Sequence, residues 1–410
     1  MSRAGCVIVG AGQAGTQLAV SLRERGYSGQ VTLVGQETAD PYQRPPLSKA
    51  YLMGKVDATN LTLRSANYLR EHDIDYRAGV VVEYVDAENR VVQFNSGDDL
   101  PYEHLVLATG ARNRRLALPG FNAPNVHSLR DLNDAQCLRD VLGQHHKVAV
   151  IGAGFIGMEF AAVARQSGLD VTVIEYAERP FARALTDVMA RRLRELHEAE
   201  GVRFKCRTEL TGVHVNAKGL VSAITVAGGA PITADLVLVG VGVEPNTELA
   251  QAAGVAVDNG ILVDAQLATS QPGIYAIGDC ARFPSVHAEG RSVRLESVQN
   301  AVDQAKTLAR TLTDEPTDYC AIPWFWSDQY RNKLQIAGLS DGYDRTVVRQ
   351  LPDKLGFSVF CMKGSTLLAV ESIDRPADHL LARKLIGQRV ILKDEEIKDP
   401  DVDLKAFLSG

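Results

Sequence analysis

Residues 6–15 read Cys-Val-Ile-Val-Gly-Ala-Gly-Gln-Ala-Gly, and residues 148–157 read Val-Ala-Val-Ile-Gly-Ala-Gly-Phe-Ile-Gly. Each stretch is an apolar run followed by glycines in the pattern G-x-G-x-x-G. A helical pattern follows each one, and then a second apolar run, at 31–34 and at 171–174. The sequence therefore predicts two strand, helix, strand units, and this internal repeat is the strongest indication of an α/β fold.

The glycines of the repeat have a specific physical use. The first two let the backbone turn tightly and approach a pyrophosphate, and the third lets the helix pack closely on the strand. The phosphates then lie at the helix N-terminus, where free N–H groups favour anions. A single motif also occurs in ordinary glycine-rich turns, but two copies in this context predict two dinucleotide sites. The glycines are Gly10, Gly12 and Gly15 in the first copy and Gly152, Gly154 and Gly157 in the second.

A polar residue after the second strand completes each unit. In the second copy it is Glu175, whose carboxylate would accept hydrogen bonds from ribose hydroxyls and repel a 2′-phosphate, so we predict NADH over NADPH. In the first copy Gln36 and Glu37 are both candidates, because the pattern does not fix the strand register to one residue. One nicotinamide and one flavin is the economical pairing, because a flavin accepts hydride and can release single electrons.

The composition excludes several classes of protein. The chain has 410 residues, 45% of them hydrophobic, and a net charge of -6. Its length suggests two or three domains, and its acidic balance disfavours a nucleic-acid partner. No segment approaches the roughly 18 to 20 apolar residues that cross a bilayer. The first apolar run is too short for a signal peptide, so we predict a cytoplasmic protein that does not bind membranes.

The six cysteines form no C-x-x-C pair and no metal-ligand spacing. In a large cytosolic chain they are expected to be reduced thiols. Disulfide reductases need a thiol pair or a redox thiol beside the flavin. We therefore expect electrons to leave the flavin directly, to an external one-electron carrier.

Five further segments resemble a known family. Residues 105–110, Leu-Val-Leu-Ala-Thr-Gly, and residues 269–279, which end in Ala-Ile-Gly-Asp, resemble the A-T-G turn and the second FAD fingerprint of two-dinucleotide flavoproteins. Residues 44–49 (Arg-Pro-Pro-Leu-Ser-Lys), 295–301 (Leu-Glu-Ser-Val-Gln-Asn-Ala) and 324–329 (Trp-Phe-Trp-Ser-Asp-Gln) are similar to segments of NADH-dependent ferredoxin reductases. The whole chain resembles these reductases, which belong to bacterial oxygenase systems.

The resemblance implies a set of site residues. For FAD it implies Gly10, Gly12, Ala14, Gly15, Gln36 or Glu37, Arg44, Lys49, Val82, Ala108, Thr109, Gly110, Arg130, Gly278, Asp279 and Val298. For NADH it implies Gly152, Gly154, Phe155, Ile156, Gly157, Glu159, Glu175, Tyr176, Arg183, Gly242 and Glu296. The predicted catalytic residues are Lys49 near the isoalloxazine, Glu159 as its plausible partner, and Trp326 facing the flavin. The family often has an acid where this chain has Gln36, which leaves open whether Gln36 or Glu37 holds the FAD ribose.

Several of these residues also suit plainer roles. Without the resemblance, Lys49 is typical of a solvated surface. Trp326 is explained equally well by core packing and by flavin contact. A turn residue at Asp279, a first-turn acid at Glu296 and an exposed cation at Arg130 are each credible.

The expected fold is α/β, a two-dinucleotide-binding-domain flavoprotein with two Rossmann-like domains and a smaller C-terminal α+β domain. The expected bounds are 1–113 and 245–320 for the FAD domain, 114–244 for the NADH domain and 321–410 for the C-terminal domain. The resemblance implies an FAD-dependent enzyme, a monomer or weak dimer, that passes electrons from NADH to an acidic 2Fe-2S ferredoxin. That ferredoxin would feed a haem monooxygenase or a Rieske dioxygenase. Candidate docking cations, each alone more typical of a solvated face, are Arg64, Lys306, Arg310, Arg331 and Lys333.

Three other functions compete with this one. A flavin disulfide reductase and an NADH oxidase or peroxidase both want a redox cysteine near the flavin, which the cysteine pattern opposes. A signalling or structural flavoprotein similar to apoptosis-inducing factor would show slow flavin reduction and a stable charge-transfer complex.

Overall fold

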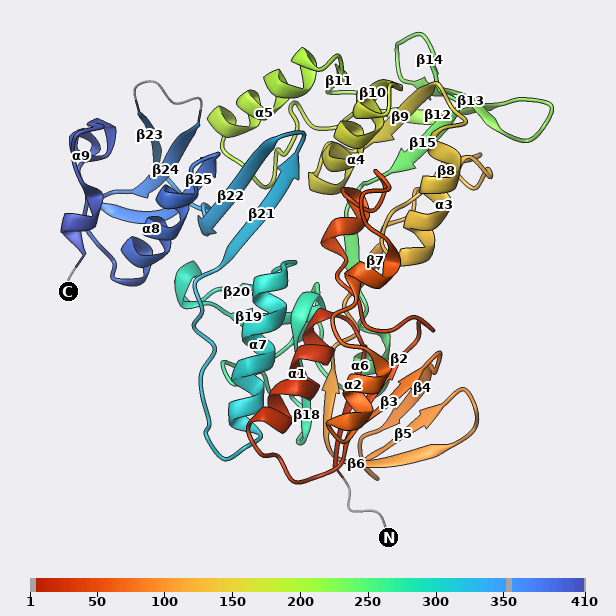
Figure 1. Ribbon diagram of the computed structural model, residues 1–410, viewed down its shortest axis with the longest axis vertical. Helices are drawn as coiled ribbons and strands as arrows, with labels where there is room; N and C mark the ends of the chain where they lie inside the picture. The colour runs from red at the N-terminus through yellow and green to blue at the C-terminus, as the bar shows by residue number, and fades with distance from the viewer. Residues whose placement is uncertain (1–4, 352–355, 409–410) are drawn as a thin grey trace. The chain divides into compact units, whose positions relative to one another are not determined.

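The structure, a computed structural model, describes residues 5–351 and 356–408 (Figure 1). They form two compact units, each built from separate stretches of the chain. Unit 1 comprises the residues up to Gln43, Thr59–Arg112 and Glu244–Phe325. Unit 2 comprises Arg44–Ala58, Asn113–Val243 and the residues from Trp326 onward. Each dinucleotide-type glycine motif therefore lies in a different unit.

Unit 1 is built on a seven-stranded sheet with the order β3-β2-β1-β6-β5-β4, in which β18 also pairs with β6. The pairs β1–β2, β1–β6, β2–β3 and β6–β18 are parallel, whereas β4, β5 and β6 form an antiparallel meander. The strands are β1 (Gly5–Val9), β2 (Val31–Gly35), β3 (Ile74–Ala78), β4 (Val82–Asp86), β5 (Val91–Phe94), β6 (Asp99–Leu107) and β18 (Ile274–Ala276).

Helices α1 (Gln13–Glu24) and α7 (Val298–Thr311) pack side by side in unit 1 (Figure 1). Their apolar faces join the strand residues in one core, in which Ile8, Leu18 and Leu308 are fully buried. This packing fixes the N-terminal end of α1, which follows the first glycine turn. The remaining elements that lie wholly in unit 1 are α2 (Ala66–Glu71), α6 (Glu248–Ala252), η3 (Gly278–Cys280), η4 (Val286–Ala288), β17 (Ile261–Leu262), β19 (Ala281–Pro284) and β20 (Ser292–Val293).

Unit 2 contains an all-parallel sheet with the order β11-β10-β9-β15-β8. Strand β15 is apolar and buried, and β10 is buried except at its first residue, as expected of parallel strands covered on both faces. Strands β12, β13 and β14 form a separate antiparallel meander in unit 2. The elements are β8 (Val126–His127), α3 (Leu132–Leu142), β9 (Lys147–Ile151), α4 (Phe155–Gln166), β10 (Asp170–Ile174), α5 (Asp187–Ala199), β11 (Arg203–Lys205), β12 (Leu210–Val215), β13 (Val221–Val226), β14 (Ile232–Thr233) and β15 (Leu236–Val239).

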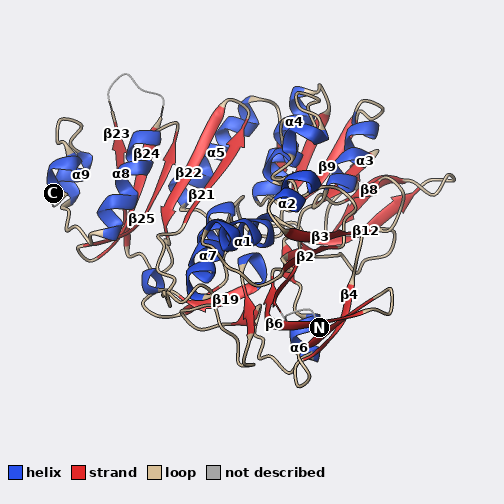
Figure 2. Ribbon diagram, turned by 60° about the horizontal axis from the view of Figure 1, so that its bottom comes forward, coloured by secondary structure: helices blue, strands red, loops and turns tan. Residues whose placement is uncertain are grey.

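The C-terminal part of unit 2 is an antiparallel sheet, covered by α8 (Figure 2). Its strand order is β21-β22-β25-β24-β23, and β21 begins with the last two residues of unit 1. The elements are β21 (Trp324–Gln329), β22 (Asn332–Gly338), β23 (Arg345–Gln350), β24 (Phe357–Lys363), β25 (Thr366–Ile373), α8 (Pro376–Gly387), α9 (Asp394–Lys398) and η5 (Leu404–Phe407).

Short elements complete the two units. The 3₁₀ turn η1 (Pro45–Ser48) belongs to unit 2. Tyr51 follows this turn, and its hydroxyl donates a hydrogen bond to the Gln136 side chain of α3 at 2.6 Å. The elements at the unit boundaries are η2 (Ala58–Leu61), β7 (Ala111–Asn113) and β16 (Val243–Pro245), and β7 pairs with β16.

Candidate functional site

The first glycine turn joins β1 to α1 in unit 1. Gly10 has φ +113°, and a Cβ on it would lie 2.2 Å from the Ala108 carbonyl oxygen. A Cβ on Gly15 would lie 1.9 Å from the Gly10 carbonyl oxygen, so this glycine allows the close packing of helix on strand. Gly12 has an ordinary φ of -79°, and nothing lies within 4 Å of its would-be Cβ. The protein itself therefore does not need glycine at this position, and the open space beside it fits a phosphate.

The second glycine turn, between β9 and α4 in unit 2, repeats this arrangement. Gly152 has φ +93° and lies against the Gly240 carbonyl oxygen, and Gly157 lies against the Gly152 carbonyl oxygen. Gly154 has φ -82° and open space where its Cβ would be. In each copy, therefore, the packing of the protein requires the first and third glycines. The middle glycine, Gly12 or Gly154, instead faces open space that a ligand could occupy.

The N-termini of α1 and α4 leave their first N–H groups available. Gly12 and Gly154 are the N-cap residues, neither helix has a side-chain cap, and neither first turn carries an acid. In contrast, α2, α3, α5 and α7 are capped by Ser65, Asp131, Thr186 and Ser297. Uncapped N–H groups together with the helix dipole form an anion site, so both turns fit the pyrophosphate of a dinucleotide.

Glu175 directly follows β10 and lies across the second glycine turn. Its Oε2 accepts a hydrogen bond from the Ala153 N–H at 2.7 Å, and its Oε1 accepts one from the Ala177 N–H at 2.8 Å. The carboxylate is thus held rigidly at the end of the strand. It keeps lone pairs for ribose hydroxyls, since a carboxylate can accept about four hydrogen bonds.

The corresponding positions in unit 1 are arranged differently. Gln36 directly follows β2 and is exposed, whereas Glu37 is half-buried and accepts a hydrogen bond from the Tyr42 hydroxyl at 2.5 Å. The choice between Gln36 and Glu37 as the ribose ligand therefore stays a prediction.

Other FAD residues predicted from the sequence also lie in unit 1, two of them against the first turn. Ala108 packs against Gly10, and the Thr109 hydroxyl donates to the Asn246 carbonyl at 2.7 Å. Gly278 has φ +79° and lies near Ala14, and its N–H donates to the buried Gln304 side chain of α7 at 2.7 Å. Asp279 follows on η3, Val298 begins α7, Gly110 has φ +65°, and Val82 is buried in the core of unit 1.

Asp279 lies beside a pair of charged side chains in unit 1. Arg294 donates to the Asp279 carbonyl oxygen at 3.0 Å and forms an ion pair with Glu296 at 2.7 Å. Glu296, which the sequence assigns to NADH, is exposed just before α7. Its role toward a nicotinamide stays a prediction.

Three residues predicted to serve FAD lie in unit 2. Arg44 donates to the Arg130 carbonyl oxygen at 2.8 Å, and the Arg130 N–H donates to the Asp134 carboxylate at 2.8 Å. The segment 44–49 is thereby tied to the start of α3. Burial, the largest cause, raises the pKa of Asp134. The third residue, Lys49, is part of the ion pair described next.

Lys49 and Glu159 form a largely buried ion pair in unit 2. The Lys49 ammonium lies 2.6 Å from Glu159 Oε2, and the side chains are 16% and 2% exposed. Glu159 also accepts hydrogen bonds from the hydroxyls of Ser48 and, at 2.7 Å, Ser327. The Lys49 ammonium has a further acceptor in the Pro45 carbonyl at 3.1 Å. The structure thus places together the predicted lysine and its predicted partner, and sequence analysis missed the two serines.

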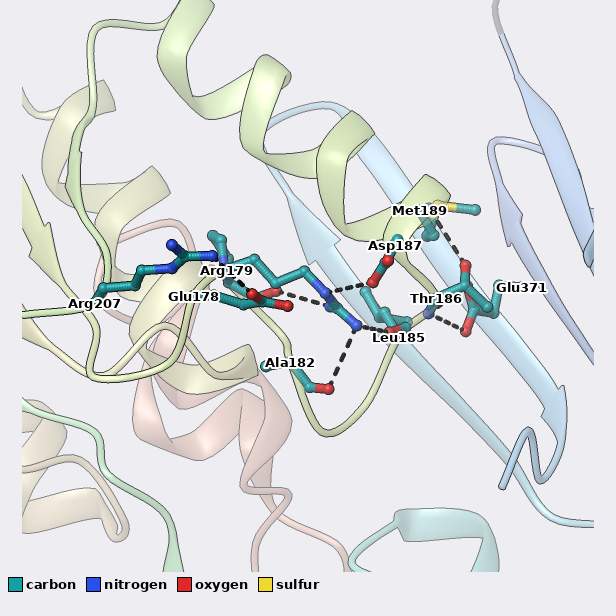
Figure 3. Close-up of polar contacts among 10 residues, drawn as sticks. Glu178, Arg179, Ala182, Leu185, Thr186, Asp187, Met189, Arg207 and Glu371 are labelled. Atoms are coloured by element: carbon teal, nitrogen blue, oxygen red, sulfur yellow. Dashed lines mark hydrogen bonds and ion pairs between the residues drawn. The ribbon is translucent and has the colours of Figure 1, made fainter. Parts of the chain in front are cut away.

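Residues 176–186 form the loop between Glu175 and α5 and carry Tyr176, 78% exposed, and the exposed Arg183. Arg179 forms an ion pair with Asp187 at 2.6 Å and donates to the Leu185 carbonyl at 3.0 Å (Figure 3). The loop is therefore held by its own arginine, while two predicted NADH residues remain open to solvent.

The end of this loop is fixed by a carboxylate from the C-terminal sheet. Glu371 of β25 is fully buried and accepts hydrogen bonds from the Thr186 N–H at 2.9 Å and the Thr186 hydroxyl at 2.6 Å (Figure 3). Burial raises the pKa of Glu371 to about 7, although the Thr186 bonds and Arg179 act in the opposite direction. Sequence analysis missed this residue, whose only signal was a glutamate inside an apolar strand.

The other predicted nicotinamide residues lie in or near the second turn. Phe155 begins α4 and packs against Phe181 with ring centroids 5.3 Å apart, and Ile156 is 43% exposed. Gly242 has φ +98° and open space where its Cβ would be. Trp326 is half-buried on β21, so the choice between packing and flavin contact stays open for this residue.

The six cysteines are all free thiols. Cys280 is fully buried beside Asp279, and its thiol contacts the carbonyls of Leu107 and Ile277. Burial raises the pKa of Cys280 and raises that of Cys6 to about 12. Thiols of this kind are poor nucleophiles at neutral pH. Within the described ranges, no helix is long and apolar enough to span a membrane, and no cluster of acidic, histidine or cysteine side chains is suited to a metal ion.

The chain belongs to the pyridine nucleotide-disulphide oxidoreductase family, whose model matches residues 5–305. A second model, described as a reductase C-terminal domain, matches residues 324–408.

Similar proteins narrow the class further. The chain is 49% identical over 403 residues to rhodocoxin reductase of Rhodococcus erythropolis, which covers 98% of this chain and 94% of that protein. It is 39% identical over 408 residues to putidaredoxin reductase CamA of Pseudomonas putida, and the match covers 98% of this chain and 96% of that protein. A crystal structure of the ferredoxin reductase for the CYP199A2 system of Rhodopseudomonas palustris superimposes with a TM-score of 0.96 at 43% identity, covering 99% of this chain and 100% of that one.

These likenesses confirm the predicted fold class and the predicted enzyme class. The chain is a flavoprotein oxidoreductase of the ferredoxin reductase type, which uses FAD and a nicotinamide nucleotide. The solved covalent complex of putidaredoxin reductase with putidaredoxin also superimposes, with a TM-score of 0.95 at 39% identity over 99% of this chain and 98% of that one.

Proposed function

We propose that this enzyme passes electrons from NADH through FAD to a 2Fe-2S ferredoxin, which in turn feeds an oxygenase, either a haem monooxygenase or a Rieske dioxygenase. The observation that carries the proposal is the pair of uncapped glycine turns, one in each unit, in a chain that is end to end similar to ferredoxin reductases. The site residues and the four-segment domain division predicted above are part of the proposal.

The chain's own residues supply binding, orientation and charge. The N–H groups at the starts of α1 and α4 would hold the two pyrophosphates, and Glu175 would select a ribose without a 2′-phosphate. Lys49, held by Glu159, would place positive charge beside the flavin edge and favour its reduced form. FAD, when bound, supplies the chemistry that links a hydride donor to a one-electron acceptor.

The thiols support direct electron transfer over a disulfide relay. The cysteine beside Asp279 is buried with a raised pKa, and no two of the six are paired. A disulfide reductase would need a reactive thiolate beside the flavin. Cys6, Cys280 and Cys361 are buried with raised pKa values, which supports a route without a thiol relay.

The ferredoxin partner is proposed to be acidic. The five candidate docking cations named above are all exposed, and complementary charge speeds the encounter of partners even when the net charge of each is negative. We propose that the enzyme is a monomer or weak dimer in the cytoplasm.

The test is an anaerobic mixing experiment on the purified holoenzyme. NADH should bleach the flavin absorbance rapidly, and a 2Fe-2S ferredoxin added afterwards should become reduced at a rate that falls as salt is raised. Bleaching without transfer to any of several ferredoxins would favour an oxidase, disulfide or signalling role. A protein without flavin, or one that NADH does not bleach, would refute the dinucleotide assignments.

A further inference from the structure

A single file of buried hydrogen bonds runs through unit 2 and ends on the Lys49–Glu159 pair. Ser327 donates to Glu159 Oε1 at 2.7 Å, and the Gln329 amide donates to Ser327 Oγ at 3.1 Å. Gln329 Oε1 lies 2.8 Å from His197 Nε2, and the Tyr330 hydroxyl lies 3.2 Å from His197 Nδ1. The file connects strand β21 of the C-terminal sheet to helices α4 and α5 of the nucleotide-binding part.

The file is well isolated from water. Ser327 and His197 are fully buried, and Gln329 is 2% exposed. Only Tyr330, at the far end, is partly exposed. In such surroundings each hydrogen bond is stronger than in water, and successive bonds polarise one another.

The direction of every hydrogen bond follows from the carboxylate. Glu159 can only accept, so Ser327 must donate to it and must itself accept from the Gln329 amide. The Gln329 carbonyl then faces His197, so the Nε2 of this histidine carries the proton. A neutral imidazole leaves Nδ1 bare, and the Tyr330 hydroxyl donates to it. All four donors therefore point toward Glu159.

His197 and Tyr330, at the far end of the file, both stay uncharged over the working range of pH. Burial lowers the pKa of His197 to about 4, so the ring is neutral. Burial raises the pKa of Tyr330, with Glu200 acting in the same direction and Arg165 against it. Arg194, above the ring of Phe204, and its ion-pair partner Glu198 are further charged groups on α5. Because an amide does not readily pass on a proton, the Gln329 link makes the file an orienting device and not a proton path.

Tyr330 has an unusual backbone conformation at the turn between β21 and β22. Its φ is +56°, a left-handed conformation that is strained for a residue other than glycine. Its ring packs edge-on against His197 with centroids 4.9 Å apart. The turn therefore keeps a tyrosine in a strained position where its hydroxyl and its ring both meet the histidine.

We propose that Ser327, Gln329, His197 and Tyr330 are positioning residues that orient Glu159 and keep the proton on Lys49, so that the lysine stays cationic during flavin reduction. The inference rests on the proposed function in one respect, the place of Lys49 beside the flavin. Without the Ser327 hydroxyl, Glu159 has one donor fewer and competes more strongly for the Lys49 proton. The pair then becomes neutral more readily, and the positive charge is lost.

The test compares two buried serines of the C-terminal sheet that each donate to a carboxylate. Ser327→Ala cuts the file, whereas Ser358→Ala removes an equally buried hydroxyl that donates to Asp378 at 2.8 Å, outside the file. The holoenzyme variants are mixed anaerobically with saturating NADH at a series of pH values. We expect Ser327→Ala to reduce its flavin about tenfold more slowly, with the alkaline loss of rate moved to lower pH, and Ser358→Ala to match the wild type in both.

Two further variants keep the test decisive if Ser327→Ala folds poorly. In Gln329→Glu, which conserves shape, the new carboxylate attracts the donors of both Ser327 and His197, so the Ser327 hydroxyl turns away from Glu159. Tyr330→Phe removes one hydroxyl at the partly exposed end and should shift the pH profile in the same direction, about twofold in rate. Wild-type rates and pH profiles in all three would overturn the proposal. Wild-type enzyme that NADH fails to bleach would instead refute the proposed function.

Discussion

The two glycine turns have the same backbone design but different surroundings. Gly12 and Gly154 both leave open space at an uncapped helix start, so each turn is suited to phosphates. Two residues after the third glycine, however, α1 carries Gln17 and α4 carries Glu159. Gln17 donates to Ser21 on its own helix at 3.0 Å, whereas Glu159 accepts from Lys49 and two serines.

The loops after the second strands differ as well. The unit 2 loop is held by two carboxylates, Glu175 at its start and Glu371 at its end. In unit 1, the side chain of Glu37 is held by the hydroxyl of Tyr42, five residues along the chain. The comparison indicates that the repeated glycines provide phosphate binding, while the residues around each copy set what else that copy does.

The largest effect is expected from the glycines that the packing requires. Gly15→Ala and Gly157→Ala would place a Cβ 1.9 Å and 2.3 Å from a backbone carbonyl oxygen, so the helix must move. We expect each to lose at least about 3 kcal/mol of stability. Gly12→Ala and Gly154→Ala meet no atom within 4 Å and should keep stability within about 0.5 kcal/mol. Thermal melts of the apoproteins measure this difference.

The middle glycines then separate the two ligands. Gly12→Ala should release FAD more readily, whereas Gly154→Ala should retain FAD and raise the KM for NADH, because each new methyl group occupies the phosphate side of its own turn. Flavin content after dialysis and steady-state kinetics give the readout. Unchanged binding of both ligands would show that the open space is not where phosphates lie.

The next prediction compares the loss of stability on replacing Glu159 with the loss on replacing Gln17. Glu159→Gln leaves the Lys49 ammonium without its counter-charge in a site where the lysine side chain is 16% exposed. Breaking a buried pair in this way costs about 3–5 kcal/mol. Gln17→Ala, which removes one bond on a partly exposed face, should cost less than about 1 kcal/mol. Urea unfolding of both variants is the measurement, and equal losses would contradict the assigned difference.

Sequence reasoning predicted the repeat well because its signals are local. In each copy the glycine motif and its two flanking apolar runs lie within one short stretch, from β1 to β2 and from β9 to β10, so the pattern is visible in the local sequence. The Lys49–Glu159 pair, 110 residues apart, could be suggested only because a buried lysine needs a counter-charge.

The contacts that sequence reasoning missed join distant segments. Ser327 meets Glu159 across 168 residues, and Glu371 meets Thr186 across 185. The sequence signals of such contacts are weak. Glu371 is a glutamate within an apolar strand, and His197, which bonds to Gln329, continues the spacing of Met189 and Leu193 on the buried face of α5. Such signals show that a polar residue is buried, but they do not name its partner.

A smaller effect, on the pH dependence of stability, is expected from Glu371, which holds the end of the unit 2 loop. A carboxyl whose pKa rises to about 7 on folding keeps its proton between pH 4.5 and 7, where the unfolded chain has lost it. Stability therefore falls as the pH rises through this window, by at most about 3 kcal/mol in total, and this group adds no pH dependence below or above it. Glu371→Gln should remove that slope while still accepting from Thr186.

Charged and titratable groups interact with Glu371 from several sides, and the Tyr343 hydroxyl is one of them. Arg179, paired with Asp187, lies on the loop side, and the buried Cys361 lies on the sheet side with its pKa raised by burial. Glu195→Gln on α5, where the side chain is 54% exposed, is the matched control and should keep the wild-type slope. Denaturant unfolding at pH 5, 6, 7 and 8 tests this, and equal slopes in all three proteins would rule out Glu371 as the titrating group.

The smallest effect concerns the choice of nicotinamide and the carboxylate at the start of the unit 2 loop. Glu175→Ala removes the acceptor for a ribose hydroxyl and the repulsion of a 2′-phosphate. We expect the kcat/KM ratio of NADH over NADPH to narrow about tenfold, equivalent to about 1.4 kcal/mol. Glu178→Ala, on the same loop but 64% exposed and paired with Arg207, should leave the ratio unchanged.

The reciprocal variant Gln36→Glu in unit 1 should also leave the NADH over NADPH ratio unchanged, because that turn is assigned to FAD. A ratio that moved with Gln36→Glu and not with Glu175→Ala would mean that the two turns have been assigned to the wrong nucleotides.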